Sequence, residues 1–200
     1  MVTLSKSRIE ALSDGVFSIA MTLLVLKLEV PEVMHHSSNQ AMLEQLLALA
    51  PQFTTFVATF LIAGGFWFLH HLTFHFIRNV DGFLVWVNLF FLMFISLLPF
   101  SAGLMSHFSV HPVSQLFYFG NQLAIALLLN VHWQYARWRS LTVDAEPHEV
   151  TRLSFRVGLT AAVFAACIVV AIFYPAYSWT PLPALVVIGM IIERWKIHRR

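Results

Sequence analysis

Long apolar runs separated by short polar clusters dominate the chain. Three stretches contain no Lys, Arg, Asp or Glu at all: residues 45–77, 82–136 and 157–192. A helix needs roughly 20 apolar residues to cross a bilayer, so the second and third stretches each have room for two crossings. With the amphipathic segment at its start, the chain is predicted to form six spanning helices. They lie near residues 9–30, 50–73, 82–104, 113–135, 156–174 and 180–195.

Composition supports a membrane protein. The chain is 58% hydrophobic and only 11% charged, whereas soluble domains are about one quarter charged. This excludes an ordinary soluble domain and a disordered chain, and a net charge of +2 with scattered cations argues against nucleic-acid binding. The single cysteine, Cys167, excludes a disulfide scaffold within the chain. We therefore predict an all-α polytopic membrane protein in which residues 1–200 form a single six-helix domain.

The distribution of cations predicts the orientation. If the N-terminus is cytoplasmic, all of the 12 Lys and Arg residues except Lys27 lie in cytoplasmic segments. This is the bias that the positive-inside rule describes, and an odd number of spans would destroy it. Both termini are therefore expected in the cytoplasm, and the protein is expected to be a multi-pass protein of the cell membrane.

The first predicted helix differs from the others because charges flank its short uncharged centre, residues 15–26. Charged side chains are costly inside a bilayer, so this helix is better suited to contact with protein or water than with lipid. At 100° per residue, Ile19, Leu23 and Leu26 share one stripe and Thr22 borders it. Aliphatic stripes usually serve for packing, so this periodicity alone does not indicate a pore.

The segment that begins at Arg8 and continues through Leu12-Ser13-Asp14 resembles the first helix of the transmembrane protein 175 family. The family signature is an Arg, three residues, and then Phe-Ser-Asp; here Leu12 stands in place of the Phe. The sequence Ile-Ser-Leu-Leu-Pro-Phe at 95–100 also looks familial. The resemblance covers essentially the whole chain, because bacterial members are six-helix subunits of this length. The family comprises potassium-permeable channels of bacteria, archaea and animal endosomes and lysosomes.

The resemblance implies a homotetramer in the lipid bilayer, with four first helices around a pore for potassium and other monovalent cations. The family lacks a carbonyl selectivity filter and has rings of bulky aliphatic side chains instead. Carried over by distance from Asp14, the narrowest ring is Ile19, followed by Leu23 and Leu26, and Thr22 occupies the selectivity position. Such a ring would gate by shape and wetting.

Arg8 and Asp14 lie on different faces of one helix, so each is expected to contact another helix or subunit, since a buried charge needs a partner. Ser13 belongs to the same polar cluster, and His70 and His71 are its expected hydrogen-bonding partners. The other polar residues within the spans are interpreted as hydrogen bonds between helices: Asn88, Ser96, Ser101, Asn121 and Gln122.

His71 and His75 have the i, i+4 spacing of a metal-binding pair. We nevertheless expect no metal, haem or other cofactor and no enzymatic activity, since the polar groups of the spans form no known catalytic spacing. The alternative to a channel is a secondary cation or proton transporter, in which the charged first helix would line a midplane site.

Overall fold

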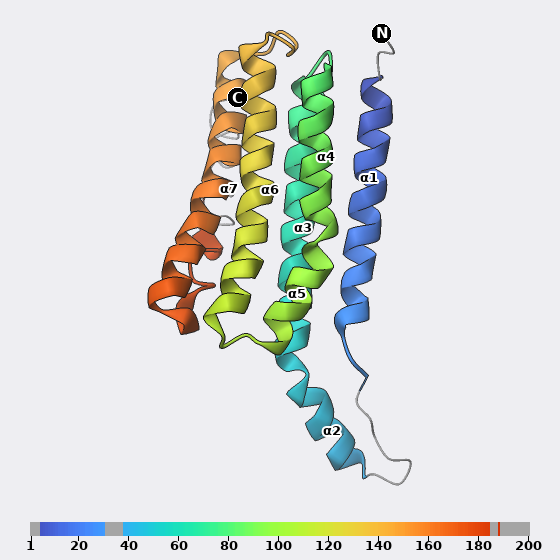
Figure 1. Cartoon of the computed structure of the whole chain (residues 1–200), viewed down its shortest axis with the longest axis vertical. Helices are drawn as coiled ribbons and strands as arrows, with labels where there is room; N and C mark the ends of the chain where they lie inside the picture. The colour runs from blue at the N-terminus through green and yellow to red at the C-terminus, as the bar shows by residue number, and fades with distance from the viewer. Residues whose placement is uncertain (1–4, 31–37, 185–187, 189–200) are drawn as a thin grey trace, which may run out of the picture.

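Helices account for the regular structure of residues 5–30, 38–184 and 188, which are the residues that the computed structural model describes (Figure 1). No strand forms within these ranges. This confirms the predicted all-α membrane class. The elements in chain order are α1 (Lys6–Leu23), η1 (Leu24–Lys27), α2 (Asn39–Ala48), α3 (Ala50–Phe76), α4 (Gly82–Ser96), α5 (Leu98–His107), α6 (Pro112–Trp138), α7 (Pro147–Phe173) and η2 (Pro175–Tyr177).

Local sequence explains where several of these helices begin. The Asp81 carboxylate accepts a hydrogen bond from the Leu84 N–H at 3.0 Å at the start of α4, and Ser38 accepts from Ala41 at 3.2 Å at the start of α2. Both side chains satisfy an N–H that the helix itself cannot. Pro lies in the first turn of α3, α5, α6 and α7, where its missing N–H costs nothing.

Five helical segments among the described residues are long and apolar enough to cross a membrane, with α4 and α5 counted together as Gly82–His107. They correspond to the first five predicted spans. The predicted sixth span, 180–195, lies mostly outside the described residues. The segment predicted as one helix at 82–104 breaks at Leu97, because Pro99 lacks the N–H that a continuous helix requires. α7 begins at Pro147 and not at residue 156, because polar residues also continue the helix.

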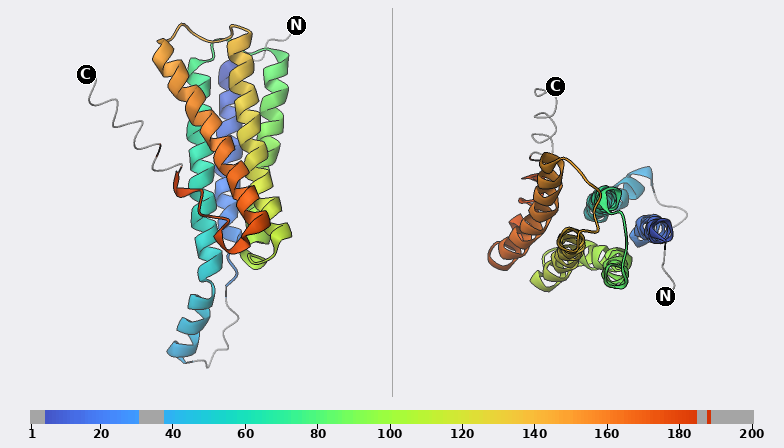
Figure 2. Two further views of the ribbon diagram at one scale, coloured as in Figure 1. Left: turned by 90° about the vertical axis from the view of Figure 1, so that its left-hand side faces the viewer. Right: turned by 90° about the horizontal axis from the view of Figure 1, so that it is seen from above.

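One helix was not predicted. α2 is a ten-residue helix that projects beyond the bundle at the end opposite the N-terminus (Figures 1 and 2). None of its residues is buried within the subunit. Its sequence carries too short a periodic pattern to distinguish it from a loop, and its helical state is favoured by the Ser38 cap and by continuity with α3.

The core is built around α6, which contacts α4, α5 and α7. Its large side chains Tyr118, Phe119 and Trp133 are fully buried. α1 instead lies at the edge of the bundle, where it packs on α3 and α4 with α6 and α7 beyond them (Figure 2, right). This arrangement leaves one side of α1 free of contact with its own subunit.

Candidate functional site

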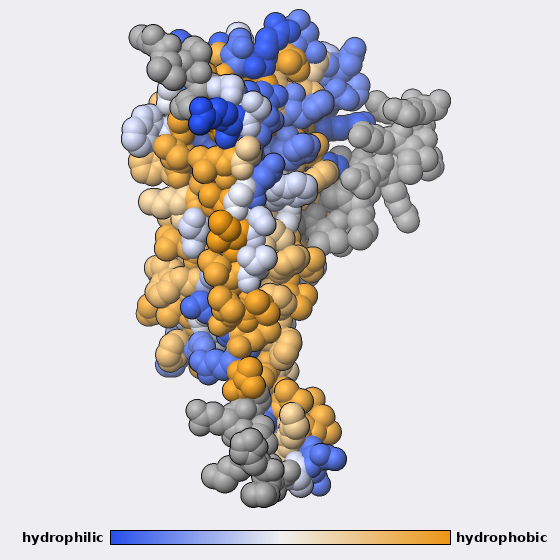
Figure 3. Space-filling view, turned by 90° about the vertical axis from the view of Figure 1, so that its right-hand side faces the viewer, coloured by the Kyte–Doolittle hydropathy of each residue, from blue (hydrophilic) through white to orange (hydrophobic). Residues whose placement is uncertain are grey.

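The two sides of the segment formed by α1 and η1 have opposite environments. The side that faces α3 and α4 is buried and includes Ile9, Ser13, Phe17, Ala20 and Leu24. On the other side, Ile19, Leu23 and Leu26 are 61%, 42% and 72% exposed. The surface on the side of α1 is hydrophilic near the N-terminal end and mainly hydrophobic below it (Figure 3). The stripe read from the sequence is therefore an uncovered apolar face, and within the subunit it does not serve for packing.

Thr22 is also exposed, and its hydroxyl is oriented by its own helix. The hydroxyl lies 3.0 Å from the Ser18 carbonyl oxygen and 2.9 Å from that of Ile19, and it donates to this pair. A hydroxyl has one hydrogen and two lone pairs, so an oxygen with accepting capacity remains. Such an oxygen can contact a cation.

A buried chain of hydrogen bonds ties α1 to α3 and α4. Asn88 Nδ2 donates to Ser13 Oγ at 3.2 Å, and Ser13 Oγ donates to the Ile9 carbonyl at 2.9 Å. The Asn88 Oδ1 atom lies 2.9 Å from His70 Nε2. Because Asn88 Oδ1 can only accept, His70 Nε2 carries the proton in this contact. The structure thus brings the expected residues Ser13 and His70 together, through an asparagine that lies between them.

Asp14 contacts α3 as expected, but through an unforeseen partner. Trp67 Nε1 donates to Asp14 Oδ1 at 2.8 Å, and the Trp67 ring stacks on His71 with the centroids 5.9 Å apart. His71 itself is exposed. Its contribution to the polar cluster is therefore indirect, through the orientation of Trp67.

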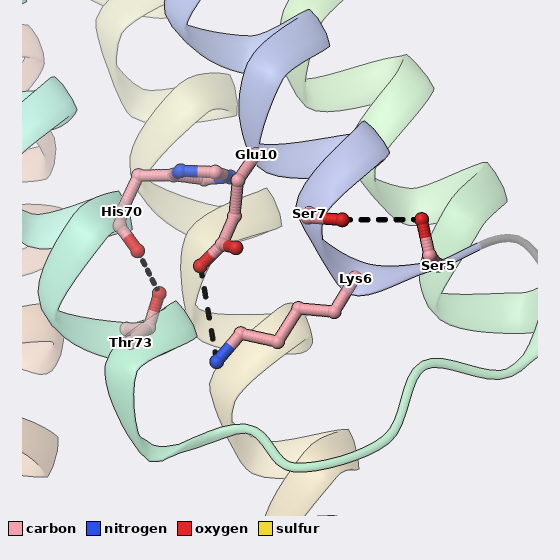
Figure 4. A network of polar contacts seen from close by, with 6 residues as sticks. All are labelled: Ser5, Lys6, Ser7, Glu10, His70 and Thr73. Atoms are coloured by element: carbon pink, nitrogen blue, oxygen red, sulfur yellow. Dashed lines mark hydrogen bonds and ion pairs between the residues drawn. The ribbon is translucent and has the colours of Figure 1, made fainter.

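Arg8 is exposed, and the ion pairs found among the described residues do not include it. At this end of α1, Lys6 Nζ lies 3.8 Å from Glu10 Oε1, and Thr73 on α3 donates to the His70 carbonyl at 2.8 Å (Figure 4). The expected contact of Arg8 with another helix is therefore not found among the described residues.

The histidines do not gather into a metal centre in the part of the chain that the structure describes, where no three His, Cys, Asp or Glu residues lie close enough to hold an ion. His71 and His75 are both exposed on α3. His132 is fully buried on α6, with its ring centroid 6.0 Å from that of His70. Two imidazoles alone make a weak donor set, since structural and catalytic zinc sites have three or four protein ligands.

Comparison with known proteins identifies relatives of this chain. A family model described as the endosomal/lysosomal potassium channel TMEM175 matches residues 8–99. A potassium channel of Chamaesiphon minutus is 33% identical over 193 residues, which cover 86% of this chain and 94% of the relative. An endosomal/lysosomal proton channel TMEM175 of Mus musculus is 31% identical over 140 residues, which cover 68% of this chain but only 28% of the mouse protein.

The fold agrees with these matches. The crystal structure of a lysosomal potassium-selective channel TMEM175 homolog from Chamaesiphon minutus superimposes with a TM-score of 0.76 at 27% identity, over 93% of this chain and 95% of that chain. The chain is a polytopic helical membrane protein of an ion-channel class. It belongs to the TMEM175 family, as the Arg8 and Ser13-Asp14 motif indicated. The family and these relatives are ion channels, so the prediction that the chain is not an enzyme is confirmed.

Proposed function

We propose that this chain is one of four identical subunits of a potassium-permeable cation channel whose pore is lined by α1. The observation that carries this proposal is the uncovered stripe of Ile19, Leu23 and Leu26, opposite a face of α1 that is buried against its own subunit. An apolar face of this kind is suited to a helix that encloses a pore with its symmetry mates. The names of the relatives, potassium channels among them, support the same function.

Ile19 forms the narrowest ring of the proposed pore, with Leu23 and Leu26 following toward the other end. Aliphatic side chains offer a cation nothing in exchange for its water, and a narrow aliphatic ring can empty of water altogether. The ring therefore acts as a gate and as a filter of limited selectivity. The Thr22 oxygens lie one turn away and replace part of the lost hydration, which favours potassium because it sheds water more readily than sodium.

We further propose that the N-terminal end of the bundle is cytoplasmic and that the channel lies in the bacterial cell membrane. At this end, Arg78 lies in the connection between α3 and α4, Arg137 in the last turn of α6 and Arg139 directly after α6. Lys6 and Arg8 lie in the first turn of α1. Lys27 lies at the opposite end of the first helical segment. This distribution of cations follows the positive-inside rule.

The test of the proposed gate is a pair of substitutions at Ile19, recorded in planar bilayers with opposed potassium and sodium gradients. Ile19→Ala widens the ring and Ile19→Asn hydrates it, so both are expected to raise cation conductance and reduce ion preference. Because Ile19 is 61% exposed in the subunit, its loss should change the free energy of unfolding little. The matched variant is Phe17→Ala, which removes a fully buried ring and should destabilise the protein by about 3–5 kcal/mol.

Folded Ile19 variants with wild-type conductance and ion preference would contradict the gate. Coupled, saturable flux without single-channel steps would instead support a secondary transporter. A wild-type reversal potential that follows the proton gradient and ignores potassium would identify protons as the permeant ion.

A further inference from the structure

A corner of aromatic side chains and one arginine lies where α4 begins and α6 ends, at the N-terminal end of the bundle. The centroid of the Tyr135 ring lies 4.3 Å from that of Phe83 and 6.0 Å from that of Trp138. The guanidinium carbon of Arg139 lies 5.9 Å from the centre of the Trp138 ring. Trp138 is 77% exposed and Phe83 is 49% exposed, so the outer part of this corner is uncovered within the subunit.

Hydrogen bonds between the two helical connections hold this corner in place. The Tyr135 hydroxyl donates to Asp81 Oδ2 at 2.7 Å, while the other Asp81 oxygen caps α4. The Val143 N–H donates to the Phe76 carbonyl at 2.8 Å, so the chain has crossed from α6 to α3 before it reaches Asp144 and the acids that follow on the way to α7. The corner is therefore a preformed surface, and a preformed surface loses less conformational entropy when it binds a ligand.

The corner lies at the level where a bilayer presents its lipid headgroups. One candidate span begins at Gly82 and another ends at Trp138, and Trp and Tyr rings are enriched at this level of a membrane. Arg139 follows directly, and the ion pairs found among the described residues do not include it. A guanidinium offers paired N–H groups that match the oxygens of a phosphate. The chemistry that suits this corner is therefore a lipid phosphate.

We propose that this corner binds an anionic phospholipid, whose phosphate accepts from Arg139 while its glycerol and first methylenes contact Trp138 and Phe83. The occupant is a lipid and not a soluble phosphate, because exposed rings continue from the corner into the span. Phe83, Trp86 and Phe90 are all exposed on one face of α4, at i, i+3 and i+7. In the proposed orientation the lipid belongs to the cytoplasmic leaflet, whose anionic lipids attract cations next to the membrane.

The experiment titrates the full-length protein, in an uncharged detergent, with a short-chain phosphatidylglycerol and counts the bound lipid by native mass spectrometry. Phosphatidylcholine of the same chain length and glycerol 3-phosphate are the comparison ligands. We expect phosphatidylglycerol to bind about ten-fold more tightly than phosphatidylcholine, because its net negative charge is not offset within the headgroup. Glycerol 3-phosphate should bind more weakly than phosphatidylglycerol, because it has no acyl chains to contact the exposed rings.

Arg139→Gln should weaken phosphatidylglycerol binding about ten-fold and remove the preference over phosphatidylcholine. Trp138→Ala should also weaken binding, whereas Trp138→Phe retains a ring and should bind more tightly than the Ala variant. Arg137→Gln is the matched control, since it removes the same charge from a guanidinium that donates to Gln134 and Ser154 at 3.3 and 3.2 Å. This control should keep the wild-type affinity. Because Trp138 and Arg139 are exposed, all variants should melt like wild type.

Equal losses of affinity in Arg139→Gln and Arg137→Gln would indicate a diffuse effect of charge and overturn the site. A preference for phosphatidylglycerol that survives Arg139→Gln would place the lipid elsewhere on the protein and overturn it as well. Glycerol 3-phosphate that binds as tightly as the lipid would make the ligand a soluble anion. Since binding is measured without current, each of these failures leaves the proposed channel function intact.

Discussion

At the residue scale, the proposed role of Thr22 in ion selectivity depends on the contacts that its hydroxyl makes with the backbone. Its hydroxyl hydrogen is directed to the carbonyls of Ser18 and Ile19 in the same helix. The oxygen on the exposed face is therefore an acceptor with a fixed orientation and not a freely rotating donor. A donor would repel a cation, whereas a held acceptor can take the place of a water molecule.

Thr22→Val should lower the potassium-to-sodium permeability ratio by about two-fold or more while current persists, because the ring keeps its width and loses its oxygens. Reversal potentials under bi-ionic conditions measure this ratio. Thr54→Val is the matched control, since Thr54 is an exposed threonine of α3 whose hydroxyl also donates to its own helix, at the Ala50 carbonyl. Equal reversal potentials for Thr22→Val and wild type would remove Thr22 from the selectivity assignment.

At the scale of the helix, the sequence predicted contacts along one element better than contacts between elements. The common face of Ile19 and Leu23 depends only on the spacing of a regular α-helix, so it could be derived from the residues. The change to the 3-10 helix η1 at Leu24 was not predicted, and Leu26 stays near this face because side chains three residues apart eclipse in such a helix. The break after Ser96 was missed because an apolar run of this length looks continuous, although Pro99 offered a signal.

The residue pairs that contact each other between helices could be identified only from the structure. Trp67 and Asp14 are 53 positions apart, and Asn88 and Ser13 are 75 apart. No periodicity relates such residues, so the partner of Asp14 could not be named. Asn88 was interpreted as an interhelical hydrogen-bonding residue, because an amide within an apolar helix needs a partner. The interpretation was right about its kind of role, while its position between Ser13 and His70 came only from the packing of α4.

Asn88→Ala should destabilise the subunit by about 1–3 kcal/mol, because it leaves buried polar atoms of His70 and Ser13 without their partner. Thermal or denaturant unfolding in detergent measures the loss. Ser96→Ala is the control from the same helix, since the Ser96 hydroxyl donates to the Leu92 carbonyl of its own helix. If both variants unfold like wild type, the network does not hold α1 in place.

At the scale of the whole molecule, the two ends of the bundle should face different compartments. With Cys167→Ala as background, Asp144→Cys lies in the connection before α7 and Ser109→Cys lies in the connection before α6. A membrane-impermeant maleimide added to intact cells should label the cysteine at 109 and spare the one at 144, which should react only after the cells are opened. The reverse pattern would place the N-terminal end outside and contradict the proposed orientation.

Assembly is the last property that the uncovered face of α1 predicts. In a ring of α1 helices, neighbouring copies of residue 26 approach one another around the axis, although Leu26 is 72% exposed in the single subunit. In the Cys167→Ala background, Leu26→Cys should therefore be cross-linked into dimers by a short bis-maleimide, because each cysteine reaches only a copy in a neighbouring subunit. Val169→Cys is the control: Val169 is 54% exposed on α7, which lies on the other side of the bundle from α1 (Figure 2), so it should remain uncross-linked.

The uncross-linked protein should have four times the 22.8-kDa subunit mass in mild detergent. A monomeric mass with retained current, or equal cross-linking at both positions, would show that α1 does not meet its symmetry mates around a pore.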